Sequence, residues 1–150
     1  MKTKKPSEID EEYWVYARSK NKKKYSESTE NCGKWMIFAY KGEQLDNIWE
    51  NVKKATERGL LGDSSKVSTN KDNSNALNKN SGVICIYTYD SNDKKDLKRI
   101  AKELFKIEEI ERLVYKEDNI THEGKYANRG DKKISKWVIT KENFKEILKE

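Results

Sequence analysis

The spacing of apolar residues changes along the first half of the chain, and it predicts two strands and a helix. Residues 13–18 are mostly aromatic or β-branched, and residues 34–40 alternate between two faces, as strands do. Over residues 43–58 the apolar positions recur at helical spacing. We expect Trp35, in the second strand, and Trp49, in the helix, to belong to the core. The helical stripe consists of Leu45, Ile48, Trp49 and Val52.

The second half of the chain predicts a central strand, a second helix and a hairpin. Residues 82–90 are apolar on both faces, as expected of a strand inside a sheet. Residues 93–105 have helical spacing, and two further strands follow at 110–116 and 134–140, joined by a turn around residues 129–131. The stripe of this second helix consists of Leu97, Ile100, Ala101, Leu104 and Phe105.

Three shorter segments complete the predicted elements. Residues 66–68 favour a short edge strand, and the polar stretch 70–82 beyond them is expected to be a long loop. Near the C-terminal end, Thr140 is expected to cap a last helix over residues 141–149.

This order of elements predicts an α+β protein: a single curved, mostly antiparallel sheet with helices packed on one face. The other face of the sheet is expected to be concave and partly open. Residues 1–11 are largely charged and are expected to form a flexible leader, and residues 12–150 a single domain.

Composition narrows the classes of function. The 150 residues include 32 Lys and Arg against 26 Asp and Glu, a net charge of +6 that favours polyanionic partners. The sequence contains neither an apolar run long enough to span a membrane nor a signal peptide, so we expect a soluble, cytoplasmic protein with no membrane partner. Cys32 and Cys85 lack metal-ligand spacing and are expected to be free thiols, with Cys85 in the core.

The sequence lacks the motifs of the common cofactor and metal sites, which predicts a protein without cofactor or metal. We find no Walker loop, dinucleotide fingerprint, zinc spacing or nucleophile elbow. Asp90 and Asp93 precede the second helix, and we interpret them as capping residues rather than ion ligands.

The segment YKEDNITHEG, residues 115–124, contains the single histidine of the chain, His122. Thr121 and Gly124 suit an ordinary polar turn. Catalysis would require a partner within hydrogen-bond reach, and no Ser/His/Asp or Cys/His pairing is visible in the sequence. The turn interpretation and a role for His122 as a catalytic acid both stay open.

Basic and aromatic residues on the predicted strands and turns suggest a binding face for a phosphorylated ligand. Lys34 begins the second strand, and Lys116 ends a later strand beside a turn, where a phosphate could be held. Aromatic rings on the same face or its loops could stack a base. The candidate rings are Trp14, Tyr25, Tyr87, Tyr89, Tyr126 and Trp137. The predicted ligand-binding residues are Lys34, Lys66, Lys116, Thr121, His122, Tyr126, Arg129 and Tyr25.

Five stretches between residues 12 and 140 carry a family resemblance. They are GKWMIF at 33–38, the helix containing Trp49, LLGDSSKVST at 60–69, ICIYTYDSND at 84–93 and LVYKEDNITHEGKY at 113–126. The last stretch has the pattern YK-x-D-x-x-T-x-x-G-x-Y. Together they resemble the Bles family, named after a basophilic-leukaemia-expressed protein. That family is similar in fold to the translation initiation factor that binds the messenger RNA cap, which implies a curved sheet backed by helices.

The resemblance also implies a ligand site on the concave face. The cap-binding factor holds its methylated guanine between tryptophans on two loops and its phosphates with Lys and Arg. In this chain the loop after the first strand offers Tyr25 instead of Trp, and the loop at 70–82 contains no aromatic residue. The resemblance therefore implies use of the concave face for another nucleotide or a phosphate.

Four functions are consistent with the sequence. The first is non-enzymatic binding of a phosphorylated ligand, such as a nucleotide, a nucleotide signal or an RNA end, on a basic aromatic concave face. The alternatives are a general RNA-binding module, an enzyme acting on a phosphorylated substrate with His122 and a lysine as acid and base, and an adaptor that binds a protein. We expect a nucleotide or RNA as partner, and the sequence leaves the oligomeric state open.

Overall fold

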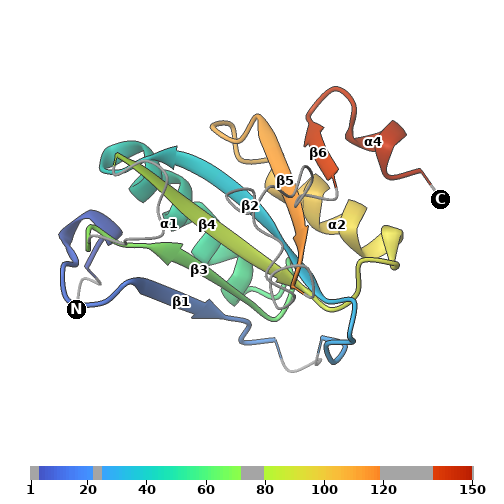
Figure 1. Ribbon diagram of the computed structural model, residues 1–150, viewed down its shortest axis with the longest axis horizontal. Coiled ribbons are helices and arrows are strands. Elements are labelled where there is room, and N and C mark those ends of the chain that lie inside the picture. Colours follow the sequence, from blue (N-terminus) through green and yellow to red (C-terminus); the bar gives the residue numbers. More distant parts are fainter. Residues whose placement is uncertain (1–3, 22–24, 72–79, 119–136, 150) are drawn as a thin grey trace, which may run out of the picture.

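The computed structural model describes residues 4–21, 25–71, 80–118 and 137–149, and their elements form one sheet with helices beside it (Figure 1). The strands are β1 (Trp14–Arg18), β2 (Gly33–Tyr40), β3 (Ser64–Ser68), β4 (Ser81–Thr88), β5 (Arg112–Glu117) and β6 (Trp137–Thr140). The helices are α1 (Glu43–Glu57), α2 (Lys94–Leu104) and α4 (Phe144–Ile147), with a short 3-10 helix, η1 (Pro6–Glu8), near the N-terminus. This confirms the predicted α+β class.

The six strands in the described residues form a single antiparallel sheet in the order β1-β3-β4-β2-β5-β6. Strand β4 lies inside the sheet, as its apolar character predicts. The prediction of an edge strand at residues 66–68 is wrong, because β3 lies between β1 and β4. Ser65 and Val67 are fully buried in β3, and Ser65 Oγ lies 2.8 Å from Thr56 Oγ1 of α1. A mostly polar strand is stable in the interior here because its buried hydroxyl has a partner.

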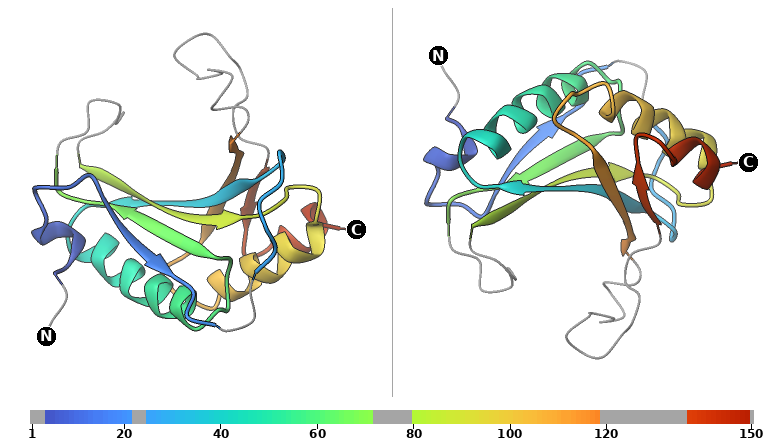
Figure 2. Two further views of the ribbon diagram at one scale, coloured as in Figure 1. Left: turned by 90° about the horizontal axis from the view of Figure 1, so that it is seen from below. Right: turned by 90° about the horizontal axis from the view of Figure 1, so that it is seen from above.

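Helices α1 and α2 cover one face of the curved sheet, and the opposite face is concave (Figure 2). The core lies between the sheet and the helices, and it contains both Trp35 and Trp49, as predicted. Strand β2 illustrates the division, because Trp35 and Ile37 are buried on the helix side while Phe38 and Tyr40 are exposed on the concave side. The alternation of side chains along a strand thus separates the core from an open face.

Asp93 caps the N-terminal end of α2, as the sequence predicts. Its Oδ1 accepts a hydrogen bond of 3.1 Å from the Asp96 N–H, which has no partner inside the helix. Within the described ranges, the structure contains no group of three or more His, Cys, Asp or Glu residues that could hold a metal ion.

The C-terminal helix is shorter than predicted. Helix α4 spans Phe144–Ile147 rather than residues 141–149, and the prediction that Thr140 caps it is wrong. Asn143 is the residue before the helix, and its side-chain oxygen accepts a hydrogen bond of 2.8 Å from the Thr140 N–H. This bond closes a turn between β6 and α4, so the helix begins later.

Part of the predicted flexible leader lies against α1. Pro6 is buried in η1, and the Ser7 N–H donates a hydrogen bond of 3.1 Å to the Asp46 carboxylate of α1. Residues 6–8 are therefore attached to the domain that the sequence predicts to begin at residue 12. None of the helices in the described ranges is long and apolar enough to cross a membrane.

Candidate anion-binding face

The concave face of the sheet brings lysines from three strands together. In the antiparallel register, Lys34 of β2 lies opposite Lys116 of β5 on one side and Tyr87 of β4 on the other. Lys66 of β3 lies opposite Cys85, which is two residues before Tyr87 and therefore on the same face of β4. The structure thus brings together three of the predicted ligand-binding residues. We call Lys34, Lys66, Lys116 and Tyr87 the lysine cluster.

Two ammonium groups of the cluster lie near the ring of Tyr87. Lys34 Nζ is 5.7 Å and Lys66 Nζ is 5.8 Å from the centroid of this ring. Lys66 Nζ is also 3.9 Å from the centroid of the Trp14 ring. These distances are within the range of cation–π attraction, which holds the two lysines close to the sheet. Two of the rings that the sequence offers for stacking therefore contact lysines.

The surroundings disfavour the charge of these lysines. Burial lowers the pKa of Lys66, and the positive charge of Lys34 lowers it further. The same two causes, in the same order, lower the pKa of Lys116. An anion placed among the lysines would have the opposite effect, because it favours the charged form of each amine. The lysine cluster is therefore electrostatically suited to an anionic ligand.

Asp118 is a member of the site that sequence reasoning missed. Its Oδ1 accepts a hydrogen bond of 2.8 Å from Lys34 Nζ, in an ion pair that is mostly shielded from solvent. Its Oδ2 accepts a 3.6 Å hydrogen bond from the Cys32 thiol, and its N–H donates one of 2.9 Å to the Cys32 carbonyl. Asp118 was not among the predicted ligand-binding residues. The signal was the register, because a β2–β5 pairing brings the residue after β5 beside the start of β2.

Cys85 is buried, as predicted, but it lies outside the core between sheet and helices. It faces the concave side, opposite Lys66 on β3 and Met36 on β2, and it is 3% exposed. Burial raises the pKa of its thiol. Cys85 therefore forms part of the floor beneath the lysine cluster. Both Cys32 and Cys85 are free thiols, as predicted.

A pocket of about 370 Å³ lies at the end of the sheet where β2 begins and β4 ends. Its lining includes Tyr25, Cys32, Tyr87, Thr88 and Asp118. Tyr87 and Asp118 each also contact a lysine of the cluster, so the pocket and the cluster are adjacent. Pockets of this size accommodate small organic ligands.

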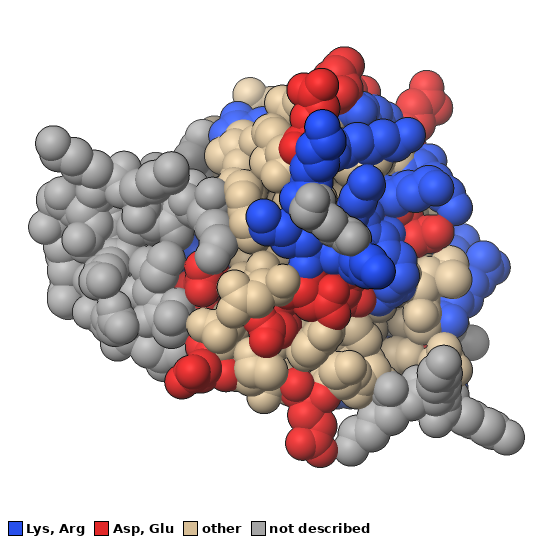
Figure 3. Space-filling view, turned by 90° about the vertical axis from the view of Figure 1, so that its right-hand side faces the viewer, with Lys and Arg blue, Asp and Glu red and all other residues tan. Residues whose placement is uncertain are grey.

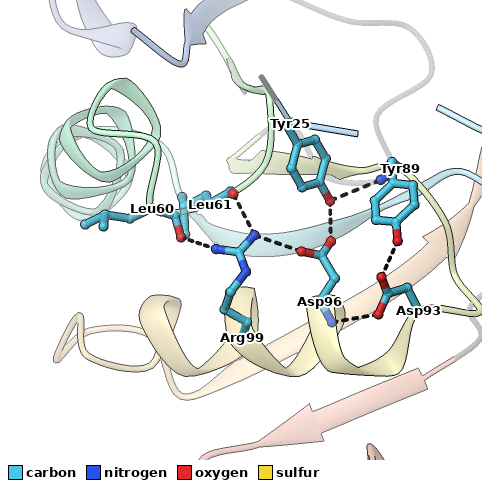
Figure 4. Close-up of polar contacts among 7 residues, drawn as sticks. All are labelled: Tyr25, Leu60, Leu61, Tyr89, Asp93, Asp96 and Arg99. Atoms are coloured by element: carbon cyan, nitrogen blue, oxygen red, sulfur yellow. Dashed lines mark hydrogen bonds and ion pairs between the residues drawn. The ribbon is translucent and has the colours of Figure 1, made fainter. Parts of the chain in front are cut away.

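Tyr25 has a structural role at this pocket, in addition to lining it. Its hydroxyl donates a hydrogen bond to the Asp96 carboxylate of α2 and accepts one of 3.2 Å from the Tyr89 N–H (Figure 4). Arg99 binds the other Asp96 oxygen at 2.8 Å and the Leu60 carbonyl at 2.9 Å. Burial raises the pKa of Tyr25, and the hydrogen bond to Asp96 raises it further. These bonds tie the segment between β1 and β2 to α2.

The remaining predicted residues are only partly described. Thr121, His122, Tyr126 and Arg129 lie outside the described residues, so the alternatives for His122 stay open. Trp137 packs against the core residue Tyr115, with ring centroids 5.4 Å apart.

Two exposed aromatic rings on the concave face were not among the predicted site residues. Phe38 is 59% exposed and Tyr40 is 67% exposed, both on the face of β2 that also carries Lys34. The alternation of β2 provides the signal, because every second residue from Lys34 lies on the open side.

Comparison with protein families identifies the chain. A family model described as Basophilic leukemia-expressed protein Bles03 matches residues 8–124. The chain belongs to the Bles03 family. The matched range includes the lysine cluster and Asp118, and it confirms the family suggested by the short motifs. A comparison of this Bles03 sequence with curated proteins finds no match.

Solved structures of eIF4E proteins share the fold of this Bles03 chain. One is eIF4E-3 of Ascaris suum with the m7G cap, at a TM-score of 0.51 and 17% identity, covering 73% of this chain and 57% of the other. Another is a schistosome eIF4E complexed with m7GpppG and 4E-BP, at a TM-score of 0.54 and 13% identity, covering 73% and 59%. The chain thus spans less than two thirds of either protein. The predicted similarity in fold is confirmed.

Proposed function

We propose that this protein binds a phosphorylated ligand, a nucleotide or an RNA end, on its concave face and releases it unchanged. One observation carries the proposal: the ammonium groups of Lys34 and Lys66 converge from two strands on the ring of Tyr87. Each lysine is held near the sheet by aromatic contacts before any ligand arrives, so little side-chain entropy is lost on binding.

The phosphate would bind between Lys34 and Lys66. Coulombic attraction and charge-assisted hydrogen bonds would replace the repulsion that contributes to the lowered pKa of Lys66. Asp118 is the ion-pair partner of Lys34, and a bound phosphate would compete with it. Because Lys34 is already paired, the bound ligand must supply more than one negative charge to displace or outweigh the carboxylate.

The base or sugar of a nucleotide would occupy the adjacent pocket of about 370 Å³. Tyr87 links the two regions, because its ring lies close to both lysines and also lines the pocket. This arrangement has the usual form of a small-molecule site, a concavity with a few fixed polar groups.

The structural neighbours support the class of ligand. Their crystals contain the m7G cap and m7GpppG, both phosphorylated nucleotides, and one also contains the protein 4E-BP. The loop differences favour a ligand other than a methylated cap. Tyr25 is held by Asp96, and the loop at residues 70–82 has no aromatic residue, so a pair of stacking tryptophans is missing from both loops.

Isothermal titration calorimetry tests the proposal. The ligands are GTP, ATP, m7GTP and inorganic phosphate, and the proteins are the wild type, Lys66→Met and the control Lys53→Met. Lys53 is half-buried on α1, on the other side of the sheet. We expect at least one nucleotide to bind with a Kd below 1 mM, and Lys66→Met to weaken it about 10- to 100-fold, the loss expected of one charge-assisted hydrogen bond. Lys53→Met should leave the Kd unchanged.

Two results would contradict the proposal. In the first, none of the nucleotides binds more tightly than 1 mM, or both variants weaken binding equally. In the second, mass spectrometry of the bound nucleotide after incubation detects a new product, which would establish conversion instead of binding alone.

A further inference from the structure

Helix α2 carries a row of lysines on the helix side of the molecule, away from the concave face. Lys94, Lys98, Lys102 and Lys106 recur at i, i+4 spacing, the last in the turn that follows the helix. Lys94, Lys102 and Lys106 are exposed and Lys98 is half-buried. Lys and Arg side chains gather on the side of the molecule where α2 and the C-terminal end lie (Figure 3). We call these four residues the α2 lysine row.

The spacing of the row is unfavourable for the helix itself, because like charges at i, i+4 repel each other. Lys94 lies at the N-terminal end, where the helix dipole disfavours a cation, and the dipole favours a cation only near the other end, where Lys102 lies. Within the described ranges, neither Lys98 nor Lys102 has an ion-pair partner, and Lys106 pairs with Glu103 at 2.9 Å. The row therefore needs an explanation other than the stability of α2.

Helix α1, on the same side of the sheet, provides the comparison. It contains four acidic residues and two lysines, and its Lys54 pairs with Glu50 at 3.7 Å. Helix α2 contains five basic and two acidic residues. The basic excess of the chain is thus concentrated on one of two neighbouring helices, which indicates a local surface for anions.

We propose that the α2 lysine row binds the phosphodiester backbone of a nucleic acid strand, a second contact that does not depend on the concave site. Each i, i+4 step advances about 6 Å along the helix, close to the distance between neighbouring phosphates along a nucleic acid strand. The row can therefore follow successive phosphates in a backbone.

Chemistry favours a nucleic acid over a lipid surface or a protein. The apolar residues of α2 are fully buried against the core, so the helix has no apolar side chain to insert into a membrane. The row also contains no aromatic anchor of the kind that dominates protein interfaces. Contacts through lysine alone read charge and spacing, so the binding is expected to tolerate any base sequence.

Fluorescence anisotropy with a labelled 20-nucleotide oligouridylate, measured from 50 to 200 mM KCl, tests this inference. The row variant Lys98→Gln with Lys102→Gln is compared with Lys53→Gln with Lys54→Gln on α1. Both variants lose two charges from one half-buried and one exposed lysine. We expect the row variant to reduce the slope of log K against log salt by about 1.4 and to weaken binding about 20-fold at 100 mM salt, since each single-strand contact contributes about 0.7 to the slope. The α1 variant should change affinity less than about twofold.

Three outcomes would overturn the inference. They are equal losses in the two variants, wild-type protein that fails to bind the oligonucleotide, and wild-type protein that binds phosphatidylserine vesicles but no RNA. The affinity of each variant for the mononucleotides keeps this test separate from the concave site. An unchanged mononucleotide Kd in the row variant is expected, and a parallel loss would count against a second, independent surface.

Discussion

The hydroxyl of Tyr25 offers a sharp test of how the site is held in place. Tyr25→Phe removes one oxygen atom, which donates a hydrogen bond to Asp96 and accepts one from the Tyr89 N–H (Figure 4). The phenyl ring stays, and so does its edge-to-face contact with the Tyr89 ring, whose centroid is 5.4 Å away. The substitution therefore isolates the two hydrogen bonds.

The expected loss of stability depends on the hydrogen-bond partners that Asp96 and the Tyr89 N–H keep after the substitution. A hydrogen bond to a charged group contributes about 1.5–3 kcal/mol, and a buried donor left without a partner costs about 1–3 kcal/mol. Arg99 still binds Asp96, whose side chain is only 11% exposed, and water can reach part of the half-buried Tyr25 site. We therefore expect a loss of about 2 kcal/mol in the free energy of unfolding. For 150 residues this loss lowers Tm by about 6 °C.

Urea denaturation followed by tryptophan fluorescence measures this loss. The matched control is Tyr89→Phe, because the Tyr89 hydroxyl also donates a hydrogen bond to a carboxylate, that of Asp93. This bond raises the pKa of Tyr89 to about 12. That bond does not also satisfy a backbone N–H, so we expect the control to lose less than about 1 kcal/mol. The reasoning is refuted if Tyr25→Phe stays within about 0.5 kcal/mol of the wild type, or if Tyr89→Phe loses as much as Tyr25→Phe.

Three further predictions concern the region around β2 and β5. A Cβ added at Gly33 would lie 2.6 Å from the Lys116 carbonyl oxygen, so Gly33→Ala should destabilise the protein by about 2 kcal/mol in urea; unchanged stability would count against this close contact. Burial and then Asp118 raise the pKa of Cys32, so Asp118→Asn should speed the alkylation of Cys32 by iodoacetamide at pH 8. Mass spectrometry measures the rate, with the buried Cys85 as internal control. An equal or slower rate would contradict the contact between Asp118 and Cys32. Burial raises the pKa of Tyr115, so as pH rises the unfolded chain loses the Tyr115 hydroxyl proton before the folded protein does. The free energy of unfolding should therefore fall as pH rises above about 10. Equal guanidinium unfolding midpoints at pH 9 and pH 11 would contradict this prediction.

Local patterns were sufficient to predict most elements of the fold. The stripe that includes Leu97 and Ile100 depends on local spacing alone, and four of its five residues are buried as expected, while Phe105, just after the helix, is partly buried. The alternation of β2 correctly separated Trp35 from Phe38. Strand order is a different kind of information, because it depends on pairing between distant segments. The polar composition of β3 therefore suggested an edge, although the strand lies between two others.

The candidate site shows the same division between local and distant information. The sequence proposed Lys34 and Lys116 from their places at the ends of predicted strands, and Lys66 from the stretch LLGDSSKVST that carries the family resemblance. The partners of these residues are distant: Asp118 is 84 residues from Lys34. Tyr25 and its partner Asp96 are similarly separated, by 71 residues. Such contacts follow from the strand register and from the packing of α2, and local patterns in the sequence predict neither.

The most direct test of the central claim is the pKa of Lys66, measured by NMR from the pH dependence of its Hε and Cε shifts, with and without saturating nucleotide. We expect the Lys66 pKa to lie below the ordinary lysine value in the free protein, because burial and Lys34 disfavour the charge, and to rise clearly when a phosphate binds beside Lys66. A nucleotide that binds and leaves the Lys66 pKa unchanged would contradict the account.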